Sequence, residues 1–186
     1  STSHVYGIPK KLPINETAST SPTSIYAGSK LAGEILCESY HKQFNMDISI
    51  VRIFSVYGPE SNNHLVIPNI VTQLKNSNII KLGNINSRRD FIFISDVINA
   101  FRIILNNING FNVYNVGAEK SYSIKEICKK FEKLSGKKII IKSNLKQTRK
   151  FDVKNIVCDA TKLKKLGWKS KMSLDKGLKK CMNIKN

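Results

Sequence analysis

Residues 24–34 decide the fold, and they read Ser24-Ile25-Tyr26-Ala27-Gly28-Ser29-Lys30-Leu31-Ala32-Gly33-Glu34. This stretch opens a predicted helix over 24–44, because apolar residues recur along it at roughly helical spacing. Tyr26 and Lys30 are four residues apart, so both side chains project from one face of that helix. A lysine ammonium beside a phenol favours the ionised phenolate. The pair can therefore take a proton from a hydroxyl group and return it.

Five further stretches accompany this helix in a fixed order along the chain. They are Ser1-Thr2-Ser3-His4-Val5-Tyr6-Gly7, Val51-Arg52-Ile53-Phe54-Ser55-Val56-Tyr57-Gly58-Pro59, Arg89-Asp90-Phe91-Ile92-Phe93-Ile94-Ser95-Asp96-Val97, Tyr114-Asn115-Val116-Gly117 and Leu166-Gly167-Trp168. The first supplies a cluster of hydroxyl groups at a predicted strand exit, where open α/β sheets hold their ligands. A Tyr-x-x-x-Lys pair also arises on helices by chance. The interpretation of Tyr26 and Lys30 as a catalytic pair therefore depends on these five further stretches.

Predicted helices and strands alternate along the chain, which is typical of an α/β fold. Besides the helix over 24–44, the patterns predict helices over 65–74, 97–105, 123–134, 160–166 and 173–182. They predict strands over 48–54, 79–82, 91–94, 112–116 and 138–141. Ser123 and Glu126 have the spacing of a capping box. Ser95 or Asp96 is the expected cap of the helix that begins near residue 97, which gives Asp96 a structural role.

The six stretches together resemble the extended short-chain dehydrogenase/reductase family, in its nucleotide-sugar epimerase/dehydratase branch, over residues 1 to about 178. The resemblance implies the C-terminal part of a Rossmann-like parallel sheet plus a smaller α/β domain that binds substrate. The Rossmann-like portion, with the Tyr-x-x-x-Lys helix, would occupy residues 1–60. The substrate domain would take most of 61–186, with segments around 90–116 returning to the Rossmann-like part. NAD is the implied cofactor, a UDP-sugar the implied substrate, and a homodimer the implied full-length form.

The resemblance assigns catalytic roles to three residues. Tyr26 would be the acid/base, Lys30 would hydrogen-bond the nicotinamide ribose and tune Tyr26, and Thr2 would hydrogen-bond the reacting sugar oxygen. Phe54 lies in the segment that would meet the nicotinamide amide, so the cofactor contacts would include Tyr26, Lys30 and Phe54. Ser3, which flanks Thr2, and Ser55 would contact substrate, although many relatives carry an asparagine at the position of Ser55.

Arginines suit a diphosphate because the planar guanidinium donates two charge-assisted hydrogen bonds. Arg89 and Arg149 are similar to the two diphosphate-binding arginines of the family, and Asp152 to the residue that contacts the nucleotide ribose. Ile156 falls where such enzymes limit the size of the C2 substituent, which leaves UDP-hexose and UDP-N-acetylhexosamine both open. His64 is interpreted as a solvated loop histidine, and no metal site is predicted.

The overall pattern is most similar to a 4-epimerase, which oxidises C4 transiently to a 4-keto sugar. The 4,6-dehydratases of the family place an Asp-Glu pair directly after the catalytic threonine, and this chain has Ser3 and His4 there. A reductase or dehydratase of the same family remains the alternative reaction. A non-catalytic nucleotide-binding remnant is the alternative outside the enzymes.

Members of this family begin with a strand and a Gly-x-x-Gly-x-x-Gly turn, whose amides cradle the cofactor pyrophosphate. This chain contains no such motif. We therefore expect it to be the C-terminal portion of such an enzyme, with most NAD contacts made elsewhere and no measurable turnover alone. An exposed apolar face is expected where further parallel strands would pair.

The composition narrows the class of partner. The 186 residues carry a net charge of +18, with 41% hydrophobic and 24% charged residues. The lysines are spread from Lys10 to Lys185 without an arginine-rich helix or an aromatic-basic motif, so no nucleic-acid partner is expected. Four widely separated cysteines predict reduced, mostly buried thiols, and the short apolar stretches predict no membrane span. A cytoplasmic protein is expected.

Overall fold

The computed structural model describes residues 1–143 and 153–182, and its helices and strands alternate as the sequence predicts. A short 3-10 helix, η1, spans Ser3–Tyr6 at the start of the chain. The helices are α1 (Ile25–Phe44), α2 (Val66–Asn76), α3 (Ile94–Leu105), α4 (Ile124–Ser135), α5 (Thr161–Lys164) and α6 (Leu174–Met182). The strands are β1 (Ile48–Ile53), β2 (Ser55–Tyr57), β3 (Ile79–Leu82), β4 (Arg88–Phe93), β5 (Phe111–Val116), β6 (Ser121–Ser123) and β7 (Ile140–Ser143).

One extended segment organises the sheets, because β1 and β2 form a nearly continuous run that changes partner at Phe54. β1 lies parallel to β5, from Ile48 opposite Phe111 to Ile53 opposite Val116. The backbone N–H of Phe54 still donates to the Val116 carbonyl at 2.9 Å, and β2 then pairs in parallel with β4. β6 pairs antiparallel with β4, while β3 and β7 form a separate parallel pair. The carboxyl ends of β1 and β5 therefore meet at a fork, the position at which open α/β sheets place ligands.

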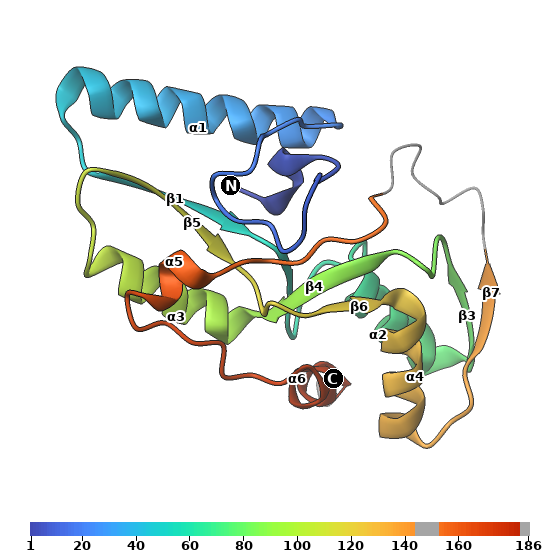
Figure 1. Ribbon diagram of the computed structural model, residues 1–186. Coiled ribbons are helices and arrows are strands. Elements are labelled where there is room, and N and C mark those ends of the chain that lie inside the picture. The colour runs from blue at the N-terminus through green and yellow to red at the C-terminus, as the bar shows by residue number, and fades with distance from the viewer. Residues whose placement is uncertain (144–152, 183–186) are drawn as a thin grey trace.

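Helices cover both faces of the β1–β5 pair. Figure 1 shows α1 on one face and α3 on the other. A buried cluster at this part of the fold includes Val51 of β1, Val116 of β5, Ile104 of α3 and the fully buried Trp168. This layered arrangement is what the alternation of strands and helices predicts.

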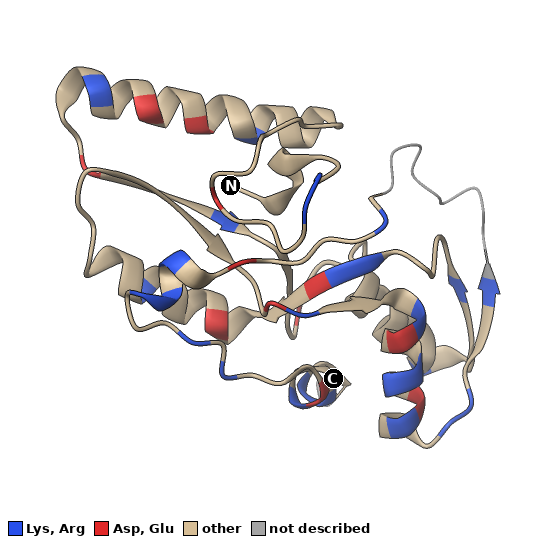
Figure 2. Ribbon diagram, in the orientation of Figure 1, with Lys and Arg blue, Asp and Glu red and all other residues tan. Residues whose placement is uncertain are grey.

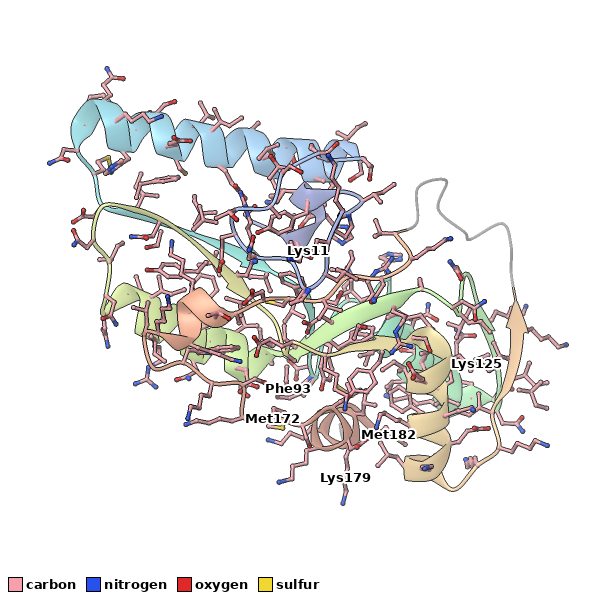
Figure 3. The ribbon with its side chains drawn as sticks, viewed as in Figure 1. Lys11, Phe93, Lys125, Met172, Lys179 and Met182 are labelled. Carbon is pink, nitrogen blue, oxygen red and sulfur yellow. The ribbon has the colours of Figure 1, made fainter. Side chains whose placement is uncertain are left out.

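A second buried cluster involves α2, α4 and α6, together with the end of β4. Leu178 of α6 is one of its fully buried members. In Figure 3, Phe93 and Met172 lie beside α6 and Met182 lies on it, whereas Lys179 of the same helix points away from the molecule. In the segment 48–57, Val51 and Phe54 belong to the first cluster and Tyr57 belongs to the second, so this segment connects the two parts of the core.

Side chains cap the starts of two helices, and one of these caps was predicted from the sequence. The Ser24 hydroxyl accepts a hydrogen bond from the Ala27 amide at 3.2 Å and starts α1. At α4 the predicted capping box is confirmed: the Ser123 hydroxyl accepts from the Glu126 amide at 3.1 Å, and the Glu126 carboxylate accepts from the Ser123 amide at 2.7 Å. Both caps satisfy backbone donors that a helix start leaves without a partner.

The predicted cap of α3 is wrong. This helix begins at Ile94, three residues earlier than expected, and no side chain caps it in the described part of the chain. Asp96 lies inside its first turn and is buried. Its carboxylate accepts from the Ser170 hydroxyl at 2.8 Å and from the amides of Lys171 and Met172. Asp96 is therefore structural, but it joins α3 to a distant loop instead of capping the helix.

The basic side chains are dispersed and the cysteines are mostly buried, as the sequence predicts. Figure 2 shows Lys and Arg dispersed over α4, α6, the short α5 and several loops. Cys128, Cys158 and Cys181 are buried free thiols, and Cys37 is half-buried, as predicted. Burial raises the pKa of Cys128 to about 12 and that of Cys181 to about 11, which keeps both thiols protonated and unreactive near neutral pH. Within residues 1–143 and 153–182, no helix is both long enough and apolar enough to cross a bilayer.

The two helices that flank the β1–β5 pair expose large apolar side chains. On α1, Ile25 and Leu36 are 94% and 61% exposed. On α3, Ile98 and Leu105 are 55% and 64% exposed. These exposed apolar side chains lie on helix faces, whereas the sequence predicts an apolar face where further parallel strands would pair.

Asp90 of β4 is fully buried where three segments meet. Its carboxylate accepts hydrogen bonds from the amides of Ala118 at 2.7 Å and Cys158 at 3.0 Å. Gly117 permits this close approach, because a Cβ there would collide with Cys158 and press against the carboxylate of Asp90. Burial raises the pKa of Asp90 from 3.8 to about 6, and the backbone hydrogen bonds only partly oppose this.

We predict that Asp90 makes the protein less stable as the pH rises from about 4 to about 6. Because the folded pKa is the higher one, the stabilising contribution is complete below the unfolded pKa and is lost as the pH passes through the folded pKa. The loss is on the order of 3 kcal/mol for a shift of this size. Urea unfolding of the wild type and Asp90→Asn at several pH values measures it.

The difference in unfolding free energy between the wild type and Asp90→Asn should shrink by most of that amount over this range and by the rest as the pH rises to about 7. Asp175→Asn, at an exposed residue of α6, controls for the loss of one negative charge. A difference between wild type and Asp90→Asn that stays constant with pH would contradict the prediction.

Candidate active site

A cleft of about 840 Å³ opens at the fork between β1, β2 and β5. Six segments contribute to it: the start of the chain, the start of α1, the segment 54–57, the start of α2, the stretch from β3 into β4, and the start of α4. Its lining includes Thr2, His4, Tyr26, Phe54, Ser55, Tyr57, His64, Leu65, Val66, Pro68, Asn69, Lys81, Asn84 and Arg89. Four of the six sequence stretches that predicted a site therefore contribute residues to one cavity.

Thr2 is held at the carboxyl end of β1. Its backbone forms a parallel bridge with Ile53, and its side chain is 6% exposed. The Thr2 hydroxyl accepts from the His4 amide at 3.3 Å and so caps η1. The hydroxyl predicted to meet substrate is thus fixed by both strand pairing and helix capping.

Tyr26 and Lys30 lie together at the start of α1, as their spacing predicts. The Lys30 Nζ is 5.7 Å from the centroid of the Tyr26 ring. Tyr26 lines the cleft and is 56% exposed, so a ligand in the cleft can reach it. The ring of His4 meets the Tyr26 ring edge-on, with centroids 6.4 Å apart.

Phe54 and Ser55 form the wall of the cleft at the fork in the sheet. Phe54 is 4% exposed and is held by its backbone hydrogen bond to β5. Ser55 is half-buried and opens β2. Both predicted residues therefore line the same cavity as Thr2 and Tyr26.

Arg89 lines the opposite part of the cleft, on β4. Its Nη1 donates to the carbonyls of Val153 at 2.7 Å and Arg88 at 2.8 Å, which orients the guanidinium. Its neighbour Arg88 pairs instead with Glu126 at 2.8 Å. Among the described residues that line the cleft, Lys81 and Arg89 are cationic and none is Asp or Glu. The cavity therefore suits an anionic ligand.

Three sequence-predicted residues of the described chain, Lys30, Ser3 and Ile156, are not among the residues that line this cavity. Ser3 is 4% exposed within η1, and Ile156 is 3% exposed in the core cluster with Val116, and neither is among the cleft-lining residues. Arg149 and Asp152 lie outside the described residues.

Sequence reasoning missed the start of α2. Leu65, Val66 and Asn69 line the cleft, and no described side chain caps this helix. The unpaired amides of a first turn and the positive end of the helix dipole attract anions. The available signal was a predicted helix that begins at Leu65 without a Ser, Thr, Asp or Asn directly before it.

A buried ion pair holds the site's elements together. Arg52 of β1 and Glu34 of α1 form a bidentate contact with Nη2 and Oε2 2.6 Å apart, and each side chain is 8% exposed. Arg52 Nη1 also donates to the Tyr6 hydroxyl at 3.0 Å, and its guanidinium stacks 4.8 Å from the Tyr6 ring. Tyr6 in turn donates to the Asn115 side chain of β5 at 2.8 Å.

Within this buried network, Arg52 and Glu34 are charged and Tyr6 is neutral. Burial opposes the charge of Arg52, but hydrogen bonds with Glu34 and Tyr6 outweigh it and raise the pKa of the guanidinium. Burial raises the pKa of Tyr6 despite its bond from Arg52, so Tyr6 remains a neutral donor. The Arg52–Glu34 pair thereby joins α1, which carries Tyr26, to β1. Through Tyr6 it also joins both to η1, which carries His4.

Comparison with known proteins decides the family. Residues 1–181 match the family described as GDP-mannose 4,6 dehydratase. The chain belongs to this family. The match confirms the resemblance to nucleotide-sugar epimerases and dehydratases of the short-chain dehydrogenase/reductase type.

Individual members of this family show how much of the fold is covered. The chain is 34% identical over 165 residues to UDP-glucuronate 4-epimerase of Thermodesulfobacterium geofontis, covering 87% of this chain and 50% of the relative. It is 28% identical over 192 residues to dTDP-D-glucose 4,6-dehydratase of Mus musculus, covering 97% and 52%.

A solved structure agrees with the fold. The chain superimposes with a TM-score of 0.91 and 32% identity on UDP-glucuronic acid 4-epimerase from Bacillus cereus, determined with UDP-glucuronic acid and NAD. The alignment covers 98% of this chain and 59% of that structure. The Rossmann-like α/β class is therefore confirmed, and the chain spans between 50% and 59% of the length of these relatives.

We predict that Glu34→Gln lowers the free energy of unfolding by about 3–5 kcal/mol, because it leaves the Arg52 charge buried without its counter-charge. Guanidinium unfolding followed by circular dichroism measures this change. The matched control is Glu38→Gln on the same helix, which removes an exposed pair with Lys42 and should cost less than about 1 kcal/mol. Equal losses in the two variants would show that the buried pair does not hold α1 in place.

Proposed function

We propose that the intact protein is a nucleotide-sugar 4-epimerase that acts on a UDP-hexose. The observation that carries the proposal is the convergence of Thr2, Tyr26 and Lys30 beside a cleft whose described lining has no carboxylate. Relatives named for epimerisation of UDP-sugars support it. The open alternatives for the sugar are a hexose and an N-acetylhexosamine.

The proton transfer belongs to Tyr26. Its phenol oxygen takes the proton of the sugar 4-hydroxyl, and Lys30 stabilises the negative charge that the phenol carries before it does so. Thr2 hydrogen-bonds the reacting oxygen and keeps it near the phenol. When the sugar turns within the cleft, Tyr26 returns the proton to the oxygen of the inverted centre.

The residues present fit the nicotinamide end of NAD. Lys30 offers an exposed ammonium next to Tyr26 for the ribose hydroxyls, and Phe54 offers a buried aromatic wall and backbone. The chemistry that NAD supplies when bound is the acceptance and return of hydride at C4 of the sugar. A UDP-sugar is then held with its 4-hydroxyl toward Tyr26.

The diphosphate is assigned to the cationic part of the cleft. Arg89, Lys81 and the start of α2 provide charge-assisted hydrogen bonds and a favourable helix dipole. Arg149 is proposed to join them, Asp152 to contact the nucleotide ribose, and Ser55 to contact the substrate.

Epimerisation is favoured over dehydration by the chemistry of the cleft. Loss of water from the sugar needs an additional acid and base besides Tyr26. The family's dehydratases supply an Asp-Glu pair after the catalytic threonine, whereas this chain has a buried Ser3 and His4. The absence of any carboxylate among the described lining residues supports the same choice.

The exposed apolar face of α1 supports a homodimer as the working form. Residues 1–60 are proposed to belong to the Rossmann-like portion, and 61–186 mainly to the substrate domain, with segments around 90–116 in the former. The four free cysteines support a cytoplasmic location.

The test is turnover of the intact protein with NAD and a panel that includes UDP-glucose and UDP-glucuronate. Tyr26→Phe should lower kcat by at least about 100-fold, because the proton acceptor is lost. Tyr40→Phe, at an exposed tyrosine of the same helix, is the matched control and should leave kcat unchanged. Undiminished turnover in Tyr26→Phe would remove that residue from its role.

A further inference from the structure

We propose that the buried Asp90 is a positioning residue for Arg89, and that its ionised carboxylate holds the segment 153–158 against β4 so that the guanidinium is oriented. This inference rests on the proposed function, since it takes Arg89 as a residue that binds the diphosphate. It assigns a task to a carboxylate that is not among the described residues lining the cleft.

The segment 153–158 lies along β4 and carries the group that orients Arg89. Arg88 of β4 exchanges backbone hydrogen bonds of 2.9 and 3.2 Å with this segment. At the start of the segment, the Val153 carbonyl accepts from Arg89 Nη1 at 2.7 Å. The direction of the guanidinium therefore depends on how this segment lies on β4.

Asp90 ties the other end of the segment to the same strand. Its Oδ2 accepts from the Cys158 amide at 3.0 Å, and its Oδ1 accepts from the Ala118 amide at 2.7 Å. The side chain is fully buried, and a Cβ at Gly117 would lie 3.0 Å from Oδ2 and collide with Cys158. One carboxylate thus joins β4 both to the segment and to the turn after β5.

The strength of these two contacts depends on the charge of Asp90. An ionised carboxylate accepts with both oxygens, whereas a protonated carboxyl group carries its proton on one oxygen, which then accepts more weakly from a backbone N–H. Protonation of Asp90 therefore loosens its contact with Cys158 or with Ala118. The backbone hydrogen bonds of Arg88 are the same in both forms, so the segment stays folded while its far end is less firmly held.

The charge of Asp90 opposes stability at neutral pH. Burial raises its pKa to about 6, so the group is ionised near pH 8 and mostly protonated near pH 5. The groups that face it are the Glu119 carboxylate, itself paired with Lys164, and the Cys158 thiol, and neither brings a positive charge to Asp90. The fold alone would gain from a neutral side chain here, so the charge serves the site.

The experiment measures the Kd of the intact protein for UDP-glucose by calorimetry between about pH 5 and pH 8, a range in which the ligand's diphosphate does not titrate. Asp90→Asn keeps the shape but has one acceptor oxygen, so it resembles the protonated form. It should raise the Kd about 10-fold near pH 8 and leave it close to wild type near pH 5. His4 and His64 line the cleft in both proteins, so their contribution cancels from the ratio. Asp175→Asn, on the exposed side of α6, should match the wild type throughout.

A double-mutant cycle with Arg89→Lys tests whether Asp90 acts through Arg89. Lysine keeps the charge but lacks the planar fork that can contact the Val153 carbonyl and a phosphate together. In the Arg89→Lys background, Asp90→Asn should change the Kd less than about 2-fold. The Kd ratio between Arg89→Lys and the wild type should also fall from pH 8 to pH 5. This last comparison leaves Asp90 unchanged, so it decides the matter even where Asp90→Asn does not fold.

The outcomes separate this inference from the proposed function. An unchanged Kd in Asp90→Asn, an equal loss of affinity at both ends of the pH range, or additive effects in the cycle would overturn the role of Asp90 while the proposed function stands. A wild type that does not bind UDP-glucose, or an Arg89→Lys variant that binds it unchanged, would overturn the assignment of Arg89 to the diphosphate and this inference with it.

Discussion

The ion pair between Arg52 and Glu34 is the contact on which the site depends. It lies in the interior and joins α1 to β1, and through Tyr6 it also fixes η1. Removing two charges from water is costly, and only good geometry with further hydrogen bonds offsets the cost. Here the guanidinium meets the carboxylate, a hydroxyl and an aromatic face together. Small shifts of α1 or η1 would break several of these contacts at once, so their relative position is sharply defined.

The features that could be predicted from the sequence are those whose cause is local. Helical spacing placed Tyr26 beside Lys30, and three-residue spacing identified the Ser123 cap with Glu126, because both partners lie within one helical turn. The role of Asp96 was predicted wrongly, since its partners are about 75 residues away in sequence. A short polar residue near a helix start has the same local pattern whether it caps the helix or binds a distant loop.

The shape and charge of the cleft could also not be predicted from short stretches of the sequence. The sequence indicated Thr2, Ser55 and Arg89 one by one, but the exclusion of carboxylates from their shared cavity depends on which residues six separate segments turn inward. His4 illustrates the same point. Its neighbours in η1 have similar access to solvent in an extended chain, and only the packing of Val5 and Tyr6 into the core leaves the imidazole facing the cleft.

The buried ion pair and the exposed Tyr26 differ in their access to water. This difference explains how the site keeps a fixed geometry and still responds to a bound ligand. The Arg52–Glu34 pair is 8% exposed and is little affected by solvent, whereas Tyr26 is 56% exposed. Water therefore screens the attraction between Tyr26 and Lys30 in the open cleft. A ligand that covers Tyr26 displaces this water and strengthens the attraction without moving either residue. Under the proposed function, proton transfer is thereby coupled to occupancy of the cleft, because the buried pair keeps the geometry constant while the ligand changes the surroundings of the phenol.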